Sequence, residues 1–115
     1  MSDEPNRKKN ELPIACALPA SEQARRQETT AEILGQAQWV EELIDGYVFS
    51  FPGSAEWGDG LVALVNSERV CCPFFVFELV FEPDQGPILL KVRGPEGVKE
   101  FIDTEIGALP PEGTA

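Results

Sequence analysis

The sequence predicts an α+β domain in which an antiparallel four-stranded sheet, built from two hairpins, has helices packed on one face. Two pairs of segments alternate like strands, and each pair is joined by a short turn. A helical segment separates the two pairs, and further helical segments precede and follow them. The expected order is therefore α-β-β-α-β-β-α, and two hairpins that bracket a helix favour an antiparallel sheet.

A chain of 115 residues is long enough for one domain. Residues 15–108 carry the periodic hydrophobic segments and are predicted to form that domain. Residues 1–14 and 109–115 contain proline and show no hydrophobic period. They are predicted to be a disordered leader and a disordered tail.

Three helices are expected. The first is predicted from Ser21 to Gln38, with Ser21 as its N-cap and a weakened end near Gly35. The second is predicted from Ser54 to Cys72, where Pro73 stops it. The third is predicted to begin at Pro95, which suits the first helical position, and to end at Gly107.

Four strands are expected. The segment from Trp39 to Phe51 predicts a hairpin that turns at the Asp45–Gly46 dipeptide, a strong two-residue turn signal. Phe74–Phe81 is the clearest strand, with alternating aromatic and aliphatic side chains. After a turn at residues 83–86, Pro87–Arg93 is expected to pair back with it.

Composition excludes several kinds of partner. The chain has 20 acidic and 9 basic side chains and a formal net charge of -11, which argues against nucleic acid and against anionic membranes. There is no signal peptide pattern and no run of transmembrane length, so a cytoplasmic location is expected. Histidine is absent, which removes His-based catalysis and every His metal site.

The most informative segment surrounds the adjacent cysteines Cys71 and Cys72. An odd total of three cysteines makes a poor disulfide framework, so free thiols are expected. On a helical projection, Glu68 and Cys72 fall within the arc of apolar side chains and Cys71 falls at its edge. A carboxyl group in that position must be paired, protonated or bound to a ligand. Its expected partners are Arg25, Arg26 or Arg93.

Thiolates are soft ligands that suit ions such as Hg(II), Cu(I), Zn(II) and As(III). Cys71 and Cys72 are therefore predicted metal ligands, in a trigonal or distorted site rather than a linear one. Cys16 is the only further cysteine that could complete the site. Glu68 is expected beside the ligands, in a supporting role, and no catalytic residue is assigned.

The run Glu68-Arg-Val-Cys-Cys-Pro-Phe74 resembles a motif of uncharacterised small bacterial proteins. Phe77-Glu-Leu79 and Gly94-Pro-Glu-Gly-Val-Lys-Glu-Phe101 resemble the same group, and the likeness covers Cys16 to Ile102. Such proteins often accompany genes for resistance to mercury or arsenic. The resemblance implies handling of a heavy metal or metalloid, by association alone.

Other interpretations stay open. The cysteines could be plain core residues, or the adjacent pair could form a strained, redox-labile disulfide. A thiol enzyme or redox protein is disfavoured, because a helix C-terminus raises a thiol pKa and no histidine can act as base. A module that forms a homodimer through its sheet is the third alternative, because Phe74, Val76 and Val80 are expected on an uncovered face.

Overall fold

The computed structural model describes residues 19–106, which form three helices and four strands in the order α-β-β-α-β-β-α. The predicted leader, the predicted tail and Cys16 lie outside these residues. None of the described helices is long and apolar enough to cross a membrane. The elements are α2 (Ala20–Leu34), β1 (Trp39–Leu43), β2 (Gly46–Phe51), α3 (Ala55–Cys71), β3 (Val76–Phe81), β4 (Ile88–Arg93) and α4 (Val98–Ile106).

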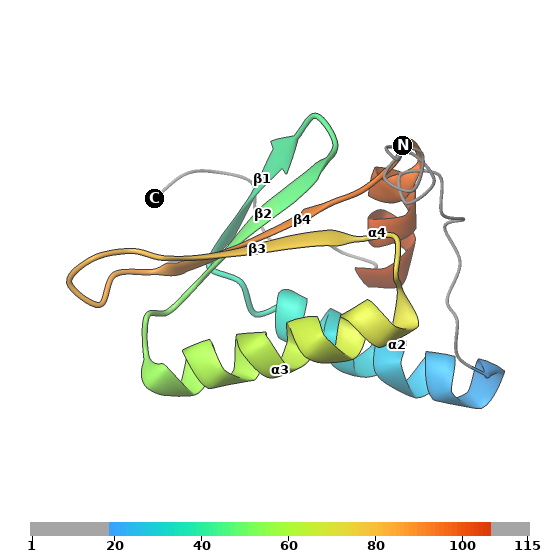
Figure 1. The fold of residues 1–115 in the computed structure, drawn as a ribbon, viewed down its shortest axis with the longest axis horizontal. Helices are drawn as coiled ribbons and strands as arrows, with labels where there is room; N and C mark the ends of the chain where they lie inside the picture. Colours follow the sequence, from blue (N-terminus) through green and yellow to red (C-terminus); the bar gives the residue numbers. More distant parts are fainter. Residues whose placement is uncertain (1–18, 107–115) are drawn as a thin grey trace, which may run out of the picture.

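The predicted fold class is confirmed. The four strands form one antiparallel sheet in the order β1-β2-β4-β3, so the two hairpins meet where β2 pairs with β4 (Figure 1). In the register of that pair Phe49 lies opposite Leu90, and Leu90 in turn lies opposite Leu79 on β3. This strand order, which the sequence pattern alone left open, makes β1 and β3 the two edges of the sheet.

The core lies between the inner face of the sheet and the helices. Alternate residues of β4 are buried, as the period-two pattern predicts, and the aromatic side chains of Phe49 and Phe51 on β2 are fully buried. Helices α2 and α3 run beneath the sheet in Figure 1. Each helix contributes apolar side chains to the same cluster. The helical members of the core are Leu34, Leu61, Leu64, Cys71, Val98 and Ile102.

Helix α3 begins and ends close to its predicted limits. Its N-cap is Ser54, whose hydroxyl accepts a hydrogen bond from the backbone N–H of Trp57 at 3.1 Å. Gly58 allows β3 to approach, because a Cβ there would lie 3.3 Å from the ring of Phe81. Pro73 disfavours helical backbone at Cys72, and Cys72 leaves the helix with φ -125° and ψ 79°.

The first hairpin turns one residue earlier than predicted. Leu43 pairs with Gly46, so the two loop residues are Ile44 and Asp45 rather than Asp45 and Gly46. Gly46 is already in β2, where its missing side chain is needed for close packing. A Cβ at this position would lie 1.8 Å from the carbonyl oxygen of Val92 on β4.

The second hairpin turns within the predicted segment. Asp84 and Gln85 occupy the loop with φ values of 58° and 55°. Positive φ at both central residues matches the twist of a tight hairpin. Neither residue is glycine, so the turn holds two side chains in the left-handed region.

The other two helices differ from the predictions at their ends. Helix α2 begins at Ala20 after Pro19 without a side-chain cap, so Ser21 is not the N-cap. It ends at Leu34 rather than Gln38, which confirms the weakness expected at Gly35. Helix α4 begins at Val98 rather than Pro95, because the chain bends and turns at residues 95–97 and Gly97 has a φ of 96°.

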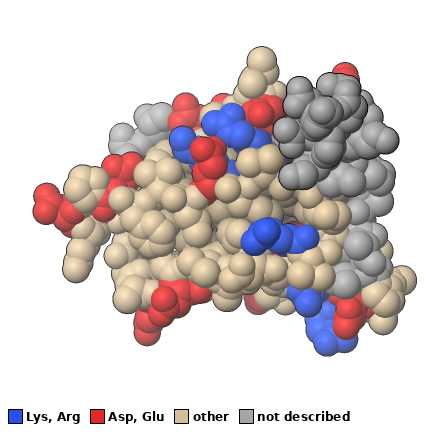
Figure 2. Space-filling model, in the orientation of Figure 1, with Lys and Arg blue, Asp and Glu red and all other residues tan. Residues whose placement is uncertain are grey.

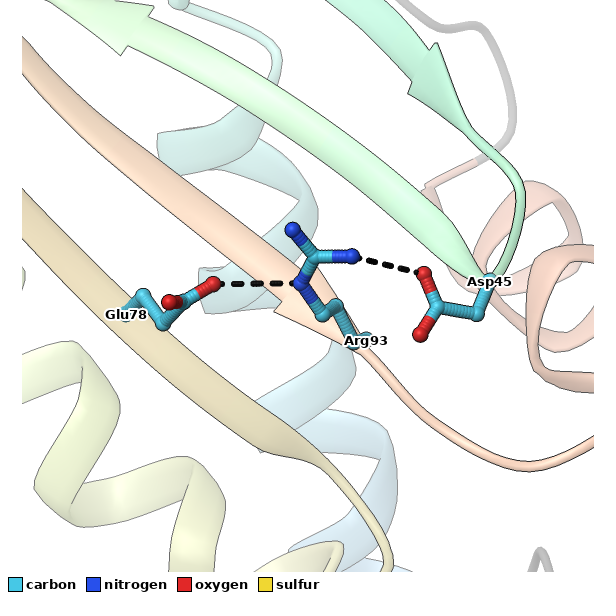
Figure 3. A network of polar contacts seen from close by, with 3 residues as sticks. All are labelled: Asp45, Glu78 and Arg93. Atoms are coloured by element: carbon cyan, nitrogen blue, oxygen red, sulfur yellow. Dashed lines mark hydrogen bonds and ion pairs between the residues drawn. The ribbon is translucent and has the colours of Figure 1, made fainter.

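A salt-bridge network crosses the outer face of the sheet at one end. Arg93 on β4 donates from Nε to Glu78 on β3 at 3.1 Å and from Nη1 to Asp45 at 2.9 Å (Figure 3). One guanidinium group thus connects the edge strand β3 with the turn between β1 and β2. All three side chains are partly exposed, so water weakens these ion pairs.

The outer face is less open than predicted. Val76 is exposed as expected, but Val80 is only partly exposed and Phe74 is buried. Phe74 precedes β3 and packs its ring against Phe75 and, edge to face, against Phe101. The prediction of an uncovered aromatic face is therefore wrong for Phe74.

Candidate functional site

The C-terminal end of α3 brings Glu68, Cys71 and Cys72 together, as the helical projection predicted. Cys71 is the last residue of the helix, and Cys72 follows it in non-helical backbone. The N–H of Cys72 still donates to the carbonyl of Glu68 at 2.6 Å, which holds the turn tight. The two Sγ atoms lie 3.7 Å apart.

Both sulfurs belong to the hydrophobic core. Cys71 is 3% exposed and Cys72 is 5% exposed, and both pack within the cluster that contains Phe74. Cys71, which the helical projection put only at the edge of the apolar arc, is thus buried as deeply as Cys72. An ion or reagent that reacts with either sulfur must therefore enter the protein interior.

The two cysteines differ in oxidation state. Cys71 is disulfide-bonded in this structure, whereas Cys72 is a buried thiol. The prediction of free thiols throughout is therefore wrong for Cys71. Cys16 lies outside the described residues, so its predicted place beside the pair stays a prediction.

Glu68 is buried, with 8% of its surface exposed, and its carboxyl group has a specific partner. The hydroxyl of Thr30 on α2 donates to Oε2 of Glu68 at 2.6 Å. Burial raises the pKa of Glu68 above its ordinary value, because the ionised form is poorly solvated there. The hydrogen bond from Thr30, the charge of Arg26 and a hydrogen bond from Cys72 oppose this effect.

The expected arginine partners of Glu68 are mostly otherwise engaged. Arg93 bonds Asp45 and Glu78 on the other face of the sheet. Arg26 lies near enough to act on Glu68 by charge, but its guanidinium hydrogen bonds go to the hydroxyl and the carbonyl oxygen of Ser67. The direct ion pair predicted for Glu68 is thus replaced by a neutral hydroxyl donor.

Thr30 is a site residue that the sequence reasoning missed. As a β-branched residue, threonine is only a weak helix former. The available signal was its spacing, because Arg26, Thr30 and Leu34 recur every four residues along α2 and share one side of the helix. Leu34 on that side is buried. The hydroxyl group of Thr30, one turn earlier on the same side, is therefore in a position to meet a buried acceptor.

A small cavity of about 30 Å³ adjoins this carboxyl group. Its walls are apolar except for Thr30 and Glu68, and they include the rings of Phe75 and Phe101. That volume is enough for about one or two water molecules. The surface of the cavity itself is apolar, because the hydroxyl group of Thr30 and the carboxyl group of Glu68 are bonded to each other.

The described residues do not form a complete metal site by themselves. Within residues 19–106 no group of three or more His, Cys, Asp or Glu side chains could hold a metal ion. In comparisons with known proteins, no family model, no curated protein and no solved structure matches the chain. The case for a function thus depends on the geometry of the cysteine pair and its carboxyl neighbour.

The raised pKa of Glu68 predicts a dependence of stability on pH. Below the ordinary pKa of 4.5 the group is protonated in both states. As the pH rises through the raised pKa, the unfolded chain ionises first and stability is lost. Glu68→Gln should therefore stabilise the protein at pH 8 more than at pH 4, as measured by urea unfolding of both proteins at both pH values.

Glu56→Gln is the matched control, because Glu56 lies exposed in the first turn of the same helix. Its replacement should give no gain at pH 8, since it removes a carboxylate from the favourable end of the helix. A Glu68→Gln gain that is equal at both pH values would contradict the assignment of a raised pKa.

Proposed function

We propose that the reduced chain binds a thiophilic metal or metalloid ion through the thiolates of Cys71 and Cys72. The observation that carries the proposal is the 3.7 Å separation of their Sγ atoms. Two thiolates bound at about 2.3 Å to one tetrahedral ion lie roughly 3.8 Å apart, against about 4.0 Å for trigonal and about 4.6 Å for linear geometry. The pair thus suits a tetrahedral or trigonal site without rearrangement of the backbone.

A third donor is needed for either geometry. The proposal assigns this role to Cys16, because sulfur ligands favour Hg(II), Cu(I), Zn(II) and As(III) over hard cations. Glu68 serves as the neighbour that orients the pair through its hydrogen bond with Cys72. The resemblance to proteins found beside mercury and arsenic resistance genes supports the same class of ion.

Binding requires that the thiol protons leave. Each thiol that binds the ion gives up one proton and keeps its electron pair for the metal–sulfur bond. The raised pKa of Glu68 makes its carboxylate a suitable acceptor for the proton of Cys72. The carboxyl group can then pass that proton to solvent when the site opens.

The oxidation state controls the proposed site. A disulfide at Cys71 removes one thiolate, so the oxidised chain lacks half of the pair. The working protein therefore requires a reducing compartment such as the cytoplasm.

Thiol–disulfide exchange is the second candidate, favoured by the Cys72 thiol lying 3.7 Å from the Sγ of a disulfide-bonded Cys71. The Cys72 thiolate would attack that sulfur, form a Cys71–Cys72 bond and release the other half of the disulfide as a thiolate. The Cys72 proton would go to Glu68. Rapid alkylation of Cys72 by iodoacetamide at neutral pH would favour this candidate, and slow alkylation would favour ion binding.

Titration of the fully reduced chain with Hg(II), Cu(I), As(III) and Zn(II) tests the proposal. At least one of these ions should produce thiolate charge-transfer absorbance that saturates at about one ion per chain. The same titration of the oxidised chain should show a much weaker signal. Equal absorbance changes for the reduced and oxidised chains would contradict a site at Cys71 and Cys72.

A further inference from the structure

Strand β3 is an edge strand whose second side is unpaired within residues 19–106. It forms hydrogen bonds with β4 alone, along all six of its residues. The remaining N–H and C=O groups point away from the sheet. An edge of this kind can pair with a strand from another chain.

The edge carries little protection against such pairing. Among its six residues, Val-Phe-Glu-Leu-Val-Phe, the only charged one is Glu78, and there is no proline. The two ends of the strand are apolar and exposed, with Val76 and Phe81 each 56% accessible. A strand with these properties is the expected site of edge-to-edge association.

The surface beside the edge is apolar as well. An open groove of about 600 Å³ runs between the end of β3 and the first half of α3, with Val62 and Phe81 among its walls. Val62 is itself exposed. In Figure 2 much of this face is uncharged, although acidic and basic side chains are both present near its centre.

The opposite edge of the sheet differs in kind. Strand β1 carries two adjacent acidic residues, Glu41 and Glu42, at its centre, and both are exposed. Glu42 is paired with Lys99, but a second copy of β1 would bring the exposed Glu41 carboxylates close to one another, which disfavours pairing. Strand β1 thus carries charges that disfavour pairing with another chain, and β3 does not. We therefore expect β3 to be the edge that accepts a partner.

We propose that β3 pairs antiparallel with β3 of a second copy of this chain, with Leu79 on the two-fold axis. A two-fold axis perpendicular to the sheet keeps the helices of both copies on the same face of the joined sheet. Because side chains alternate between the two faces, the pairing can then shift only in steps of two residues. In this register Phe77 lies opposite Phe81 of the second copy, twice by symmetry. Aromatic cross-strand pairs stabilise a sheet.

The neighbouring registers are disfavoured by charge. An axis at Glu78 would place the two Glu78 carboxylates opposite one another, and an axis at Val80 would place Glu78 opposite Glu82. With Leu79 on the axis, Glu78 lies opposite Val80 instead. Arg93 holds each Glu78 side chain over its own sheet, so its charge is already partly balanced (Figure 3).

The net charge of the chain opposes the dimer and makes it sensitive to salt. Two chains of formal charge -11 repel each other, and added salt screens that repulsion. Sedimentation velocity of the full reduced chain should show a dimer in 0.5 M NaCl that weakens at low salt. The reducing agent excludes a dimer made by intermolecular disulfides.

Substitutions at Val80 test the register. Val80→Glu would place a carboxylate opposite each Glu78, and Val80→Lys would place an ammonium group there. Val80→Glu should weaken dimerisation by about tenfold and Val80→Lys should strengthen it, because each change acts twice. Ile44→Glu and Ile44→Lys are the controls for net charge, since Ile44 is 93% exposed in the turn between β1 and β2.

A chain that is monomeric at 100 μM in 0.5 M NaCl would overturn the proposal. A dimer that responds equally to the Val80 and the Ile44 substitutions would overturn it too, because another surface would then hold the two copies together. Circular dichroism of each variant checks that the fold is retained. Neither result depends on ion binding by the cysteines.

Discussion

Replacement of both Cys71 and Cys72 by serine should lower the affinity of the reduced chain for thiophilic ions by more than about 100-fold. Loss of a group that is hydrogen-bonded to a metal ligand already lowers metal affinity by about 10- to 100-fold, and this change removes two ligands themselves. Serine keeps the size of the side chain but offers a hydroxyl group, which is a poor ligand for soft ions. Competition titration with a chelator of known affinity measures the difference.

Single substitutions separate the roles around the pair. Glu68→Gln should weaken binding by about 10- to 100-fold if the carboxyl group orients Cys72 and accepts its proton. Cys16→Ser tests the third ligand and should weaken binding without abolishing the contribution of the pair. Because a buried serine hydroxyl can destabilise the core, alanine variants and thermal melts serve as controls for folding. Binding by the Cys71→Ser, Cys72→Ser variant that equals that of the original chain would refute the site.

Gly46→Ala should lower the free energy of unfolding by about 3 kcal/mol, the upper end of the usual cost of overpacking. The added Cβ would lie 1.8 Å from the carbonyl oxygen of Val92 and 2.9 Å from the Cα of Arg93. Both contacts are with backbone, so no side chain can rotate away. The strands β2 and β4 must separate locally, and they are the pair that joins the two hairpins. Urea unfolding of both proteins measures the loss.

Gly60→Ala is the matched control for that substitution. Gly60 lies within α3, and a Cβ there would meet nothing within 4 Å. Alanine in a helix interior is favoured over glycine, so this variant should gain about 0.5–1 kcal/mol. A loss at Gly46 no larger than about 0.5 kcal/mol would mean that the two strands are not closely packed at this point.

Most of the fold follows from local patterns in the sequence. The alternation in Ile88–Arg93, the cap at Ser54 and the stop at Pro73 each depend on residues close in the chain, and each appears where it was predicted. The errors have physical reasons as well. The Asp45–Gly46 dipeptide predicts a turn, whereas in the structure the glycine is required by the close approach of β4, more than forty residues away. The strand order depends on the same long-range pairing of β2 with β4, so local sequence patterns do not predict it.

The candidate site was only partly predictable. The helical period placed Glu68 inward beside the cysteines, because both positions lie on one element. The partner of Glu68 is on another helix, and sequence charge favoured an arginine where the structure has the hydroxyl of Thr30. Packing between α2 and α3 decides this contact, and no local pattern encodes it. The oxidation of Cys71 is likewise a tertiary property.

The depth of the sulfurs has a consequence for the kinetics of loading. With Cys71 and Cys72 at most 5% exposed, an ion cannot reach them by diffusion alone. Uptake must wait for a transient local opening near the end of α3, so its rate should level off as the ion concentration rises. Release must pass through the same rare opening. The interior position would thus make the protein a slow carrier that retains its ion, rather than a rapidly exchanging buffer.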